Sequence, residues 1–448
     1  MTDSTVPPAP GPPPDRPPSP PPGAPIPPLP DRPPGPPPGQ PLSPPSSPPP
    51  DLPIPPPPDL PPDDRPRDGV PLRVSTLELF FDLVFAFTLT QLTALLAHHL
   101  SLTGVAQVLL IFGVLWWMYG GYAWLTNTRT PDRTPERVLL LTGMAGFLIV
   151  GLAIPHGFGP ETSDSGAVLG LGYLIVVLVH TALYYRLNRN IMRIAPFNIT
   201  SALLVILAGK VDGPPVYALW TAALAIQVLS PLIAHPGGRF EIQPAHFVER
   251  HGALVLVALG ESVAAIGISA SRERMTGSLI GAAVLGLALT ACLWWAYFGT
   301  GDDDRAERAF TGAAPEQRPG LALSAYFYAH IPILLGVVAM AAGVLLTIGQ
   351  AAQPHPVRQA FALSGGVALF LAGDAWFRHA LRIGTPWLRL ATAVFALAVT
   401  ALGATVAIEA QLAVLLCALV AMLAGERYAA WRYPAGWRRR RRAGGWEA

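Results

Sequence analysis

Apolar residues fall into long runs from residue 77 onward, separated by short polar segments. Runs of about 17 to 25 residues match the length of a helix that crosses the hydrocarbon core of a bilayer. The pattern therefore predicts an all-α fold, a polytopic transmembrane helical bundle. The twelve predicted spans are residues 77–97, 105–125, 138–155, 166–186, 194–209, 216–234, 253–270, 277–298, 322–348, 359–379, 386–405 and 407–424.

The composition agrees with a membrane protein. Hydrophobic residues make up 51% of the 448 residues and charged residues 13%, whereas soluble domains contain roughly 25% charged residues. The two cysteines, Cys292 and Cys417, lie inside predicted spans, where packing is a more common role than a disulfide. We expect no metal and no other cofactor.

Residues 1–72 differ in composition from the rest of the chain. They contain 35 of its 52 prolines and few aromatic or β-branched residues, so they cannot bury enough apolar surface to offset the entropy of ordering. We expect a disordered, polyproline-II-rich tail that is solvated, with binding to aromatic grooves of partner domains as the alternative. The start of the chain also lacks the pattern of a cleavable signal peptide.

The distribution of arginine and lysine predicts the orientation of the spans. Loops after the even-numbered spans, with their flanks, carry thirteen arginines, while the opposite loops carry four basic residues. This asymmetry puts both termini in the cytoplasm. The segment 426–448 contains five consecutive arginines from Arg438, which should lie against anionic lipid headgroups. That position explains the arginines without any binding of nucleic acid, and the sequence does not predict an oligomeric state.

An internal repeat is the second strong pattern. The string Leu-Trp-Trp-X-Tyr occurs late in span 2 and again late in span 8, 178 positions further on. Its aromatic members are Trp116, Trp117 and Tyr119 in the first copy and Trp294, Trp295 and Tyr297 in the second. The intramembrane acids Asp82 and Glu261 lie 179 positions apart, in nearly the same register.

These offsets predict two six-span halves, residues 73–235 and 236–425. Because six is an even number, the halves share one membrane orientation, and a site between them would hold Asp82 and Glu261 near a common axis. In the alternative interpretation, the aromatic pairs mark only the headgroup belt.

Acidic residues within the spans are the main functional candidates. A charge at bilayer depth costs about 2.5 to 3.5 kcal/mol on insertion scales, so such residues usually face the bundle interior, a partner or a cavity. Glu261 lies in an apolar run beside Ser262, and Glu78 and Asp82 are four residues apart, on one face of span 1. Arg73 lies just outside span 1, where we expect it to act on the two acids of that span.

Other polar residues in the spans leave alternatives open. Gln91, with nearby threonines, either lines a conduit or bonds neighbouring helices. His330 precedes Pro332 in span 9 and is either a neutral buried histidine or, beside an acid, a proton relay. His246 and Glu249 have a spacing found in helical metal sites, but the zinc-protease pattern is missing. We interpret their segment as a solvated, charged helix start that is paired with lipid phosphate.

Several of these segments resemble one known family. The string Leu77–Phe85 (Leu-Glu-Leu-Phe-Phe-Asp-Leu-Val-Phe), the Leu-Trp-Trp of span 2, and residues 246–252 and 259–262 resemble the bacterial low temperature requirement protein A family. The resemblance extends from about residue 73 to 425 and implies a polytopic inner-membrane protein, named for a growth phenotype in the cold, without an established activity. Where family members commonly have Arg-Phe-Gly, this chain has Arg250-His251-Gly252, which leaves His251 without a family role.

Three functions are compatible with the sequence. A secondary transporter or ion-conducting protein would use the buried acids as proton or cation sites for a small ion or metabolite. A non-catalytic protein of membrane adaptation would use them to join helices. An intramembrane enzyme would need a nucleophile or metal set beside a base, which is not visible in the sequence. We expect transport, and we expect Asp374 and Arg378, four residues apart, to neutralise each other.

Overall fold

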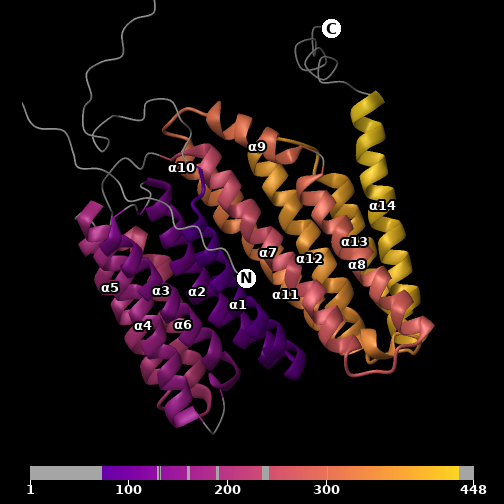
Figure 1. Cartoon of the computed structure of the whole chain (residues 1–448), viewed down its shortest axis with the longest axis horizontal. Helices are drawn as coiled ribbons and strands as arrows, with labels where there is room; N and C mark the ends of the chain where they lie inside the picture. Colours follow the sequence, from indigo (N-terminus) through magenta and orange to yellow (C-terminus); the bar gives the residue numbers. More distant parts are fainter. Residues whose placement is uncertain are drawn as a thin grey trace, which may run out of the picture. The chain divides into compact units, whose positions relative to one another are not determined.

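The structure is a computed structural model, and it describes residues 73–432 apart from 129–130, 132, 159–161, 188–190, 235–241 and 300. These described residues form helices and loops, without strands (Figure 1). The Pro-rich tail and the five consecutive arginines lie outside the described residues, so the predicted disorder and lipid contact stay predictions.

The helices follow the order of the predicted spans. In the first half they are α1 (Thr76–His98), α2 (Leu102–Thr128), α3 (Thr134–Ala153), the 3-10 turn η1 (Ile154–His156), α4 (Thr162–Leu187), α5 (Ile191–Ala208) and α6 (Pro214–Ala234). In the second half they are α7 (Pro244–Ala270), α8 (Gly277–Phe298), α9 (Asp302–Thr311), α10 (Arg318–Leu321), the π-helical η2 (Ala322–Tyr328), α11 (His330–Thr347), the 3-10 turn η3 (Ile348–Gln350), α12 (Val357–Leu381), α13 (Trp387–Thr405) and α14 (Ile408–Arg432).

Eleven helical segments among the described residues are long and apolar enough to cross a membrane. The chain is therefore a multi-pass membrane protein, as the apolar runs predict. The segment expected at 194–209 is different, because its apolar helix Met192–Ala208 is shorter than the others and contains Pro196. The loop expected after span 8 contains two short helices, α9 and α10.

Helix α1 begins at a capping box. The Ser75 side chain accepts a hydrogen bond from the Glu78 backbone, while the Glu78 carboxylate accepts one from the Ser75 backbone. This arrangement satisfies two backbone N–H groups that lack partners at a helix start. It also holds the Glu78 side chain at the point where α1 meets its neighbours.

The helices of the two halves pair in the same order. In the first half α1 packs against α2 and α3, α2 packs against α6, and α3, α4 and α5 each pack against the next helix. In the second half α7 packs against α8 and α11, α8 packs against α14, and α11, α12 and α13 each pack against the next helix. This shared order supports the predicted repeat, which stays a prediction.

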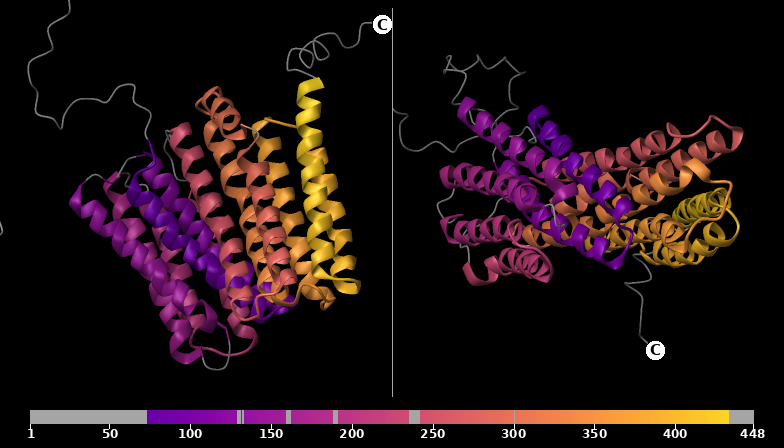
Figure 2. Two further views of the ribbon diagram at one scale, coloured as in Figure 1. Left: turned by 45° about the vertical axis from the view of Figure 1, so that its right-hand side comes forward. Right: turned by 90° about the horizontal axis from the view of Figure 1, so that it is seen from below.

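The two halves meet at α1, which packs against both α7 and α11 (Figures 1 and 2). Within the second half, small residues let α11 and α12 approach closely. A Cβ atom at Gly366 would lie 2.3 Å from the Met340 nitrogen, and one at Gly343 would lie 2.5 Å from the Leu363 nitrogen. Such close backbone contact is typical of helix pairs in membranes.

Candidate functional site

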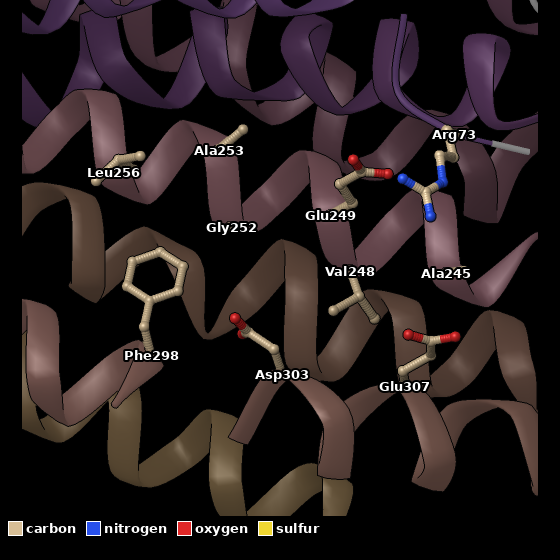
Figure 3. A pocket seen from close by; sticks show the side chains of 10 residues that line it. All are labelled: Arg73, Ala245, Val248, Glu249, Gly252, Ala253, Leu256, Phe298, Asp303 and Glu307. Carbon is tan, nitrogen blue, oxygen red and sulfur yellow. The ribbon is translucent and has the colours of Figure 1, made fainter. Parts of the chain in front are cut away.

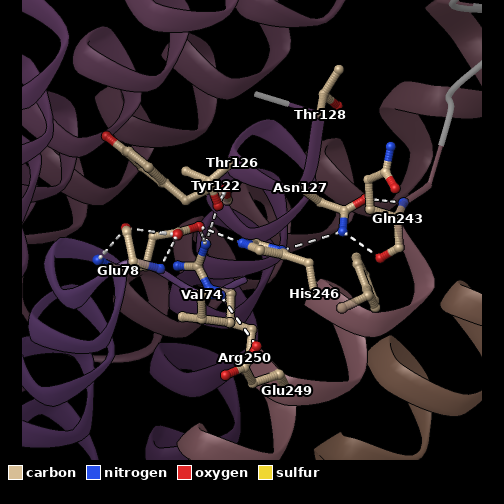
Figure 4. Close-up of polar contacts among 12 residues, drawn as sticks. Val74, Glu78, Tyr122, Thr126, Asn127, Thr128, Gln243, His246, Glu249 and Arg250 are labelled. Atoms are coloured by element: carbon tan, nitrogen blue, oxygen red, sulfur yellow. Dashed lines mark hydrogen bonds and ion pairs between the residues drawn. The ribbon is translucent and has the colours of Figure 1, made fainter. Parts of the chain in front are cut away.

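A buried network of polar side chains lies where α1, α2 and α7 meet (Figure 4). We call it the seam network because α1 and α7 come from the two halves. Each of its members is at most 3% exposed. They are Glu78 and Asp82 on α1, Tyr119, Thr126 and Asn127 on α2, and His246 and Arg250 on α7.

Arg250 is the cation of the seam network. Its Nη1 lies 3.3 Å from Oε1 of Glu78, and its Nη2 lies 3.2 Å from Oδ1 of Asp82. Nη1 also donates to the Thr126 hydroxyl, and the guanidinium carbon lies 5.6 Å from the centroid of the Tyr119 ring. A buried arginine is thus paired with two acids and stacked near an aromatic face, which lowers the cost of its burial.

His246 is held in one neutral form by its hydrogen bonds. The Gln243 backbone N–H donates to Oδ1 of Asn127 at 2.9 Å, which fixes the orientation of the Asn127 amide. The Asn127 Nδ2 therefore lies 3.3 Å from Nδ1 of His246, which must accept. The remaining proton is then on Nε2 of His246, 3.1 Å from Oε1 of Glu78.

The two carboxylates differ in how well they are satisfied. Oε2 of Glu78 accepts from the Ser75 backbone N–H at 2.9 Å and from the Ser75 hydroxyl at 2.8 Å, and Oε1 faces Arg250 and His246. Oδ1 of Asp82 accepts from the Tyr119 hydroxyl at 2.9 Å and from Arg250. Oδ2 of Asp82 is buried and has no hydrogen-bond partner among the described residues.

The seam network therefore holds more negative than positive charge. It contains two carboxylates and one guanidinium, and the hydrogen bonds of its histidine fit the neutral imidazole. An uncompensated buried charge is costly. A proton or a cation would remove the excess, and Oδ2 of Asp82 is the carboxylate oxygen that is free to take it.

Glu261 lies outside the seam network. Its Oε2 accepts from the Thr90 hydroxyl at 2.6 Å, and Thr90 lies two helical turns beyond Asp82 on α1, about 12 Å along its axis. The structure thus does not bring Asp82 and Glu261 together. Of the three surroundings expected for an intramembrane acid, Glu261 has a cavity: it is partly buried, and its neighbours Leu256 and Val263 are 53% and 45% exposed.

Arg73 is not the partner of the acids on α1. It is exposed, and it lines a cavity of about 440 Å³ that also includes Glu249, Asp303 and Glu307. Figure 3 shows the Arg73 and Glu249 side chains pointing toward each other in this cavity. Arg250 takes the role that we expected for Arg73.

Three further predicted residues lie elsewhere in the bundle. Nδ1 of His330 bonds the Ala325 carbonyl at 2.9 Å, so it carries the proton, and Nε2 accepts from the Tyr297 hydroxyl at 2.9 Å. These bonds fit a neutral buried histidine, the first of the two alternatives. Ser262 is buried, and its hydroxyl has no partner among the described residues. Gln91 is partly buried on α1.

The two aromatic strings differ in their surroundings. Nε1 of Trp116 donates to the Phe327 carbonyl at 3.1 Å, and the Trp117 ring makes an edge contact with the Phe327 ring. Trp116 thus joins α2 to η2 across the two halves. Trp294 and Trp295 are 39% and 45% exposed, as the alternative interpretation of a headgroup belt would require for this pair.

The sequence interpretation missed the α7 side of the seam network. The segment with His246 and Arg250 is not solvated, because these residues are 0% and 1% exposed. A signal was present, since His246 and Arg250 are four residues apart, as are Glu78 and Asp82 on α1, so that two polar helix faces match each other. Asn127, at the end of α2, gave no comparable signal.

A second ion-pair cluster, mostly buried but with Arg305 partly exposed, lies within the second half. Arg389 binds Glu426 through two hydrogen bonds of 2.9 Å and also contacts Asp374, while Arg378 contacts Asp302. The expected mutual pair of Asp374 and Arg378 is therefore replaced by partners on other helices. We call this set the balanced cluster; its members are Asp302, Arg305, Asp374, Arg378, Arg389 and Glu426.

The fold and the seam network define a multi-pass helical membrane protein with buried acid and arginine groups between its two halves. Over residues 73–425 the chain matches the family described as Bacterial low temperature requirement A protein (LtrA), and it belongs to this family. The resemblance found in the sequence is thus confirmed. The chain is also similar to the uncharacterized protein RA0937 of Rhizobium meliloti (strain 1021), with 28% identity over 323 residues that cover 68% of this chain and 77% of that protein.

Proposed function

We propose that the protein is a secondary transporter or ion-conducting protein in which the seam network binds a proton or a cation. The observation that carries this proposal is the excess of one carboxylate over the arginine in a buried site, together with the unpartnered Oδ2 of Asp82. Intramembrane acids of this kind commonly mark ion pathways and proton relays.

Protonation of Asp82 would change the contacts between the halves. The neutral carboxyl holds Arg250 less strongly, so that the guanidinium on α7 is left mainly to Glu78. Because α1 and α7 pack together where the halves meet, loading of the site would alter the stability of one arrangement of the halves relative to another. Alternating access needs a coupling of this type.

The second candidate is a non-catalytic role in membrane adaptation. In that case the seam network would only join α1, α2 and α7, as polar groups commonly do within a bilayer. The hydrogen bonds that Asn127 forms with Gln243 and His246 favour this role, because they tie α2 to α7 without any need for a titrating group.

A flux assay separates the two candidates. Protein in proteoliposomes is given an imposed pH gradient, and proton movement is followed with an internal pH dye. We expect Asp82→Asn to fold but to lose about tenfold or more of the proton flux, since the amide cannot titrate, while Asp304→Asn at an exposed aspartate keeps it. Unchanged flux in a folded Asp82→Asn protein would contradict a proton site at Asp82 and favour the structural role.

We propose further that both termini lie in the cytoplasm of a bacterial cell, with the protein in the inner membrane. The support is the excess of arginine in the loops after even-numbered spans. With Cys292 and Cys417 replaced by alanine, Ser271→Cys should react with an impermeant maleimide from outside the cell. Ala314→Cys should react only after the membrane is opened, and the reverse pattern would invert the orientation.

A further inference from the structure

A cavity of about 380 Å³ lies between α1 and α7, beyond the seam network. Its volume falls in the range of small-molecule sites, roughly 300 to 1,000 Å³. The α1 wall is formed by residues three or four apart, which therefore share a helix face. The cavity is lined by Leu83, Ala86, Phe87 and Thr90 from α1 and by Val257, Ala258, Gly260 and Glu261 from α7.

This cavity is reached from the lipid side of the bundle. Leu83, which lines it, and Leu256, which flanks it, are each 53% exposed, and Gly260 is also exposed. Both helices are long and apolar enough to cross the membrane, so the exposed surface between their ends faces hydrocarbon. Glu261 lies about 14 Å along α7 from Ala270, the nearer end of the helix, and near the middle of the predicted span 253–270.

The polar side chains of the cavity gather at one end. Thr90 donates its hydroxyl hydrogen to Glu261, and no described residue forms an ion pair with this carboxyl group. A bare carboxylate at this depth is costly, so a cationic ligand group would be favoured there and an anion would be rejected. The remaining walls, with Leu83, Phe87 and Val257, offer only apolar surface.

We propose that this cavity binds a lipophilic primary amine that enters from the bilayer, with its ammonium group on Glu261 and its apolar body against Leu83, Phe87 and Val257. An aminophospholipid fits less well, because its ammonium group lies at headgroup depth. The role of the amine as a transported substrate rests on the function proposed above. The binding of the amine does not depend on that function, and the experiment measures binding directly.

Two glycines on α7 provide a matched pair of variants. A Cβ atom at Gly260 or at Gly267 would meet no other atom within 4 Å, so larger side chains fit at both positions. Leucine favours a helix over glycine, and neither variant should weaken α7. Leucine at position 260 fills the cavity, whereas Gly267, seven residues further on, is not among the residues that line it.

The test uses protein in lipid nanodiscs and radiolabelled 1-naphthylmethylamine, with 1-naphthalenemethanol as the uncharged analogue. We expect saturable binding of the amine, weaker by about tenfold or more in Gly260→Leu and unchanged in Gly267→Leu. Glu261→Gln should bind amine and alcohol equally. Thermal unfolding of each variant checks that it is folded, and Gly260→Ala provides a smaller filling of the same space.

Three outcomes would contradict the proposed amine site. Absence of saturable amine binding in the unmodified protein, equal binding in Gly260→Leu and the unmodified protein, or an undiminished preference for amine in Glu261→Gln would each contradict it. Failure of the proposed function looks different. If amine binding depends on Gly260 and Glu261 but the protein shows no proton-coupled flux, the proposed transport function is contradicted and the proposed amine site is supported.

Discussion

The seam network and the balanced cluster are built from the same groups and differ in their charge. Both are sets of carboxylates and arginines on several helices; every member of the seam network is buried, whereas in the balanced cluster the Arg305 side chain is 42% exposed. The balanced cluster pairs three carboxylates with three arginines, whereas the seam network has two carboxylates and one arginine. A cluster with equal charges needs nothing further, even where one of its arginines reaches solvent, while a fully buried cluster with unequal charges needs a proton or a cation to avoid an uncompensated charge.

Their positions in the bundle differ as well. The balanced cluster joins α9, α12, α13 and α14, which all belong to the second half. The seam network joins α1 and α2 to α7, and therefore one half to the other. An excess charge inside one half would only lower the stability of that half. Between the halves, protonation of the excess carboxylate changes the contacts that hold one half against the other.

The largest expected effect comes from removing the central arginine of the balanced cluster. Arg389→Gln leaves Asp374 and Glu426 without their main cation, and breaking a buried pair in this way costs about 3 to 5 kcal/mol. The midpoint of thermal unfolding in detergent should fall strongly. A midpoint equal to that of the unmodified protein would show that this cluster does not depend on its charge balance.

The most direct test replaces one aspartate in each set with asparagine, Asp374 in the balanced cluster and Asp82 in the seam network. Asp374→Asn upsets the balance of three against three and should cost about 3 kcal/mol. Asp82→Asn removes the excess charge of the seam network, keeps Oδ1 for Tyr119 and Arg250, and should cost less than about 1 kcal/mol. Thermal unfolding of both variants under one condition provides the measurement, and equal losses would contradict the difference in charge.

Infrared spectroscopy compares the protonation of Asp82 and Asp374 without a flux assay. If Asp82 carries the proton, the carbonyl band of protonated carboxyls in the unmodified protein should lose intensity in Asp82→Asn. Asp374→Asn should keep that band, because its ionised aspartate contributes no protonated carboxyl. A band that is the same in all three proteins would place the proton on another group.

The sequence predicted those features that depend on neighbouring residues. Run length predicted the helices, and the four-residue spacing of Glu78 and Asp82 put both on one face of α1. Partners could not be predicted in this way, because Arg250 meets these acids only through the packing of α1 beside α7. Arg378 and Asp374 give the opposite lesson, since a favourable local spacing did not prevent each from pairing with another helix.

A moderate effect, below that of Asp374→Asn, is expected at a neutral contact of the seam network. Thr126→Val keeps the branched shape of the side chain but removes the hydroxyl that accepts from Arg250. The guanidinium retains Glu78 and Asp82, so the loss should be about 1 to 2 kcal/mol, smaller than that of Asp374→Asn. Thr142→Val, at an exposed threonine of α3 with a comparable bond to its own helix, should change the unfolding midpoint very little. A loss in Thr126→Val as large as that in Asp374→Asn would mean that hydrogen bonding, more than the charge count, decides the stability of the seam network.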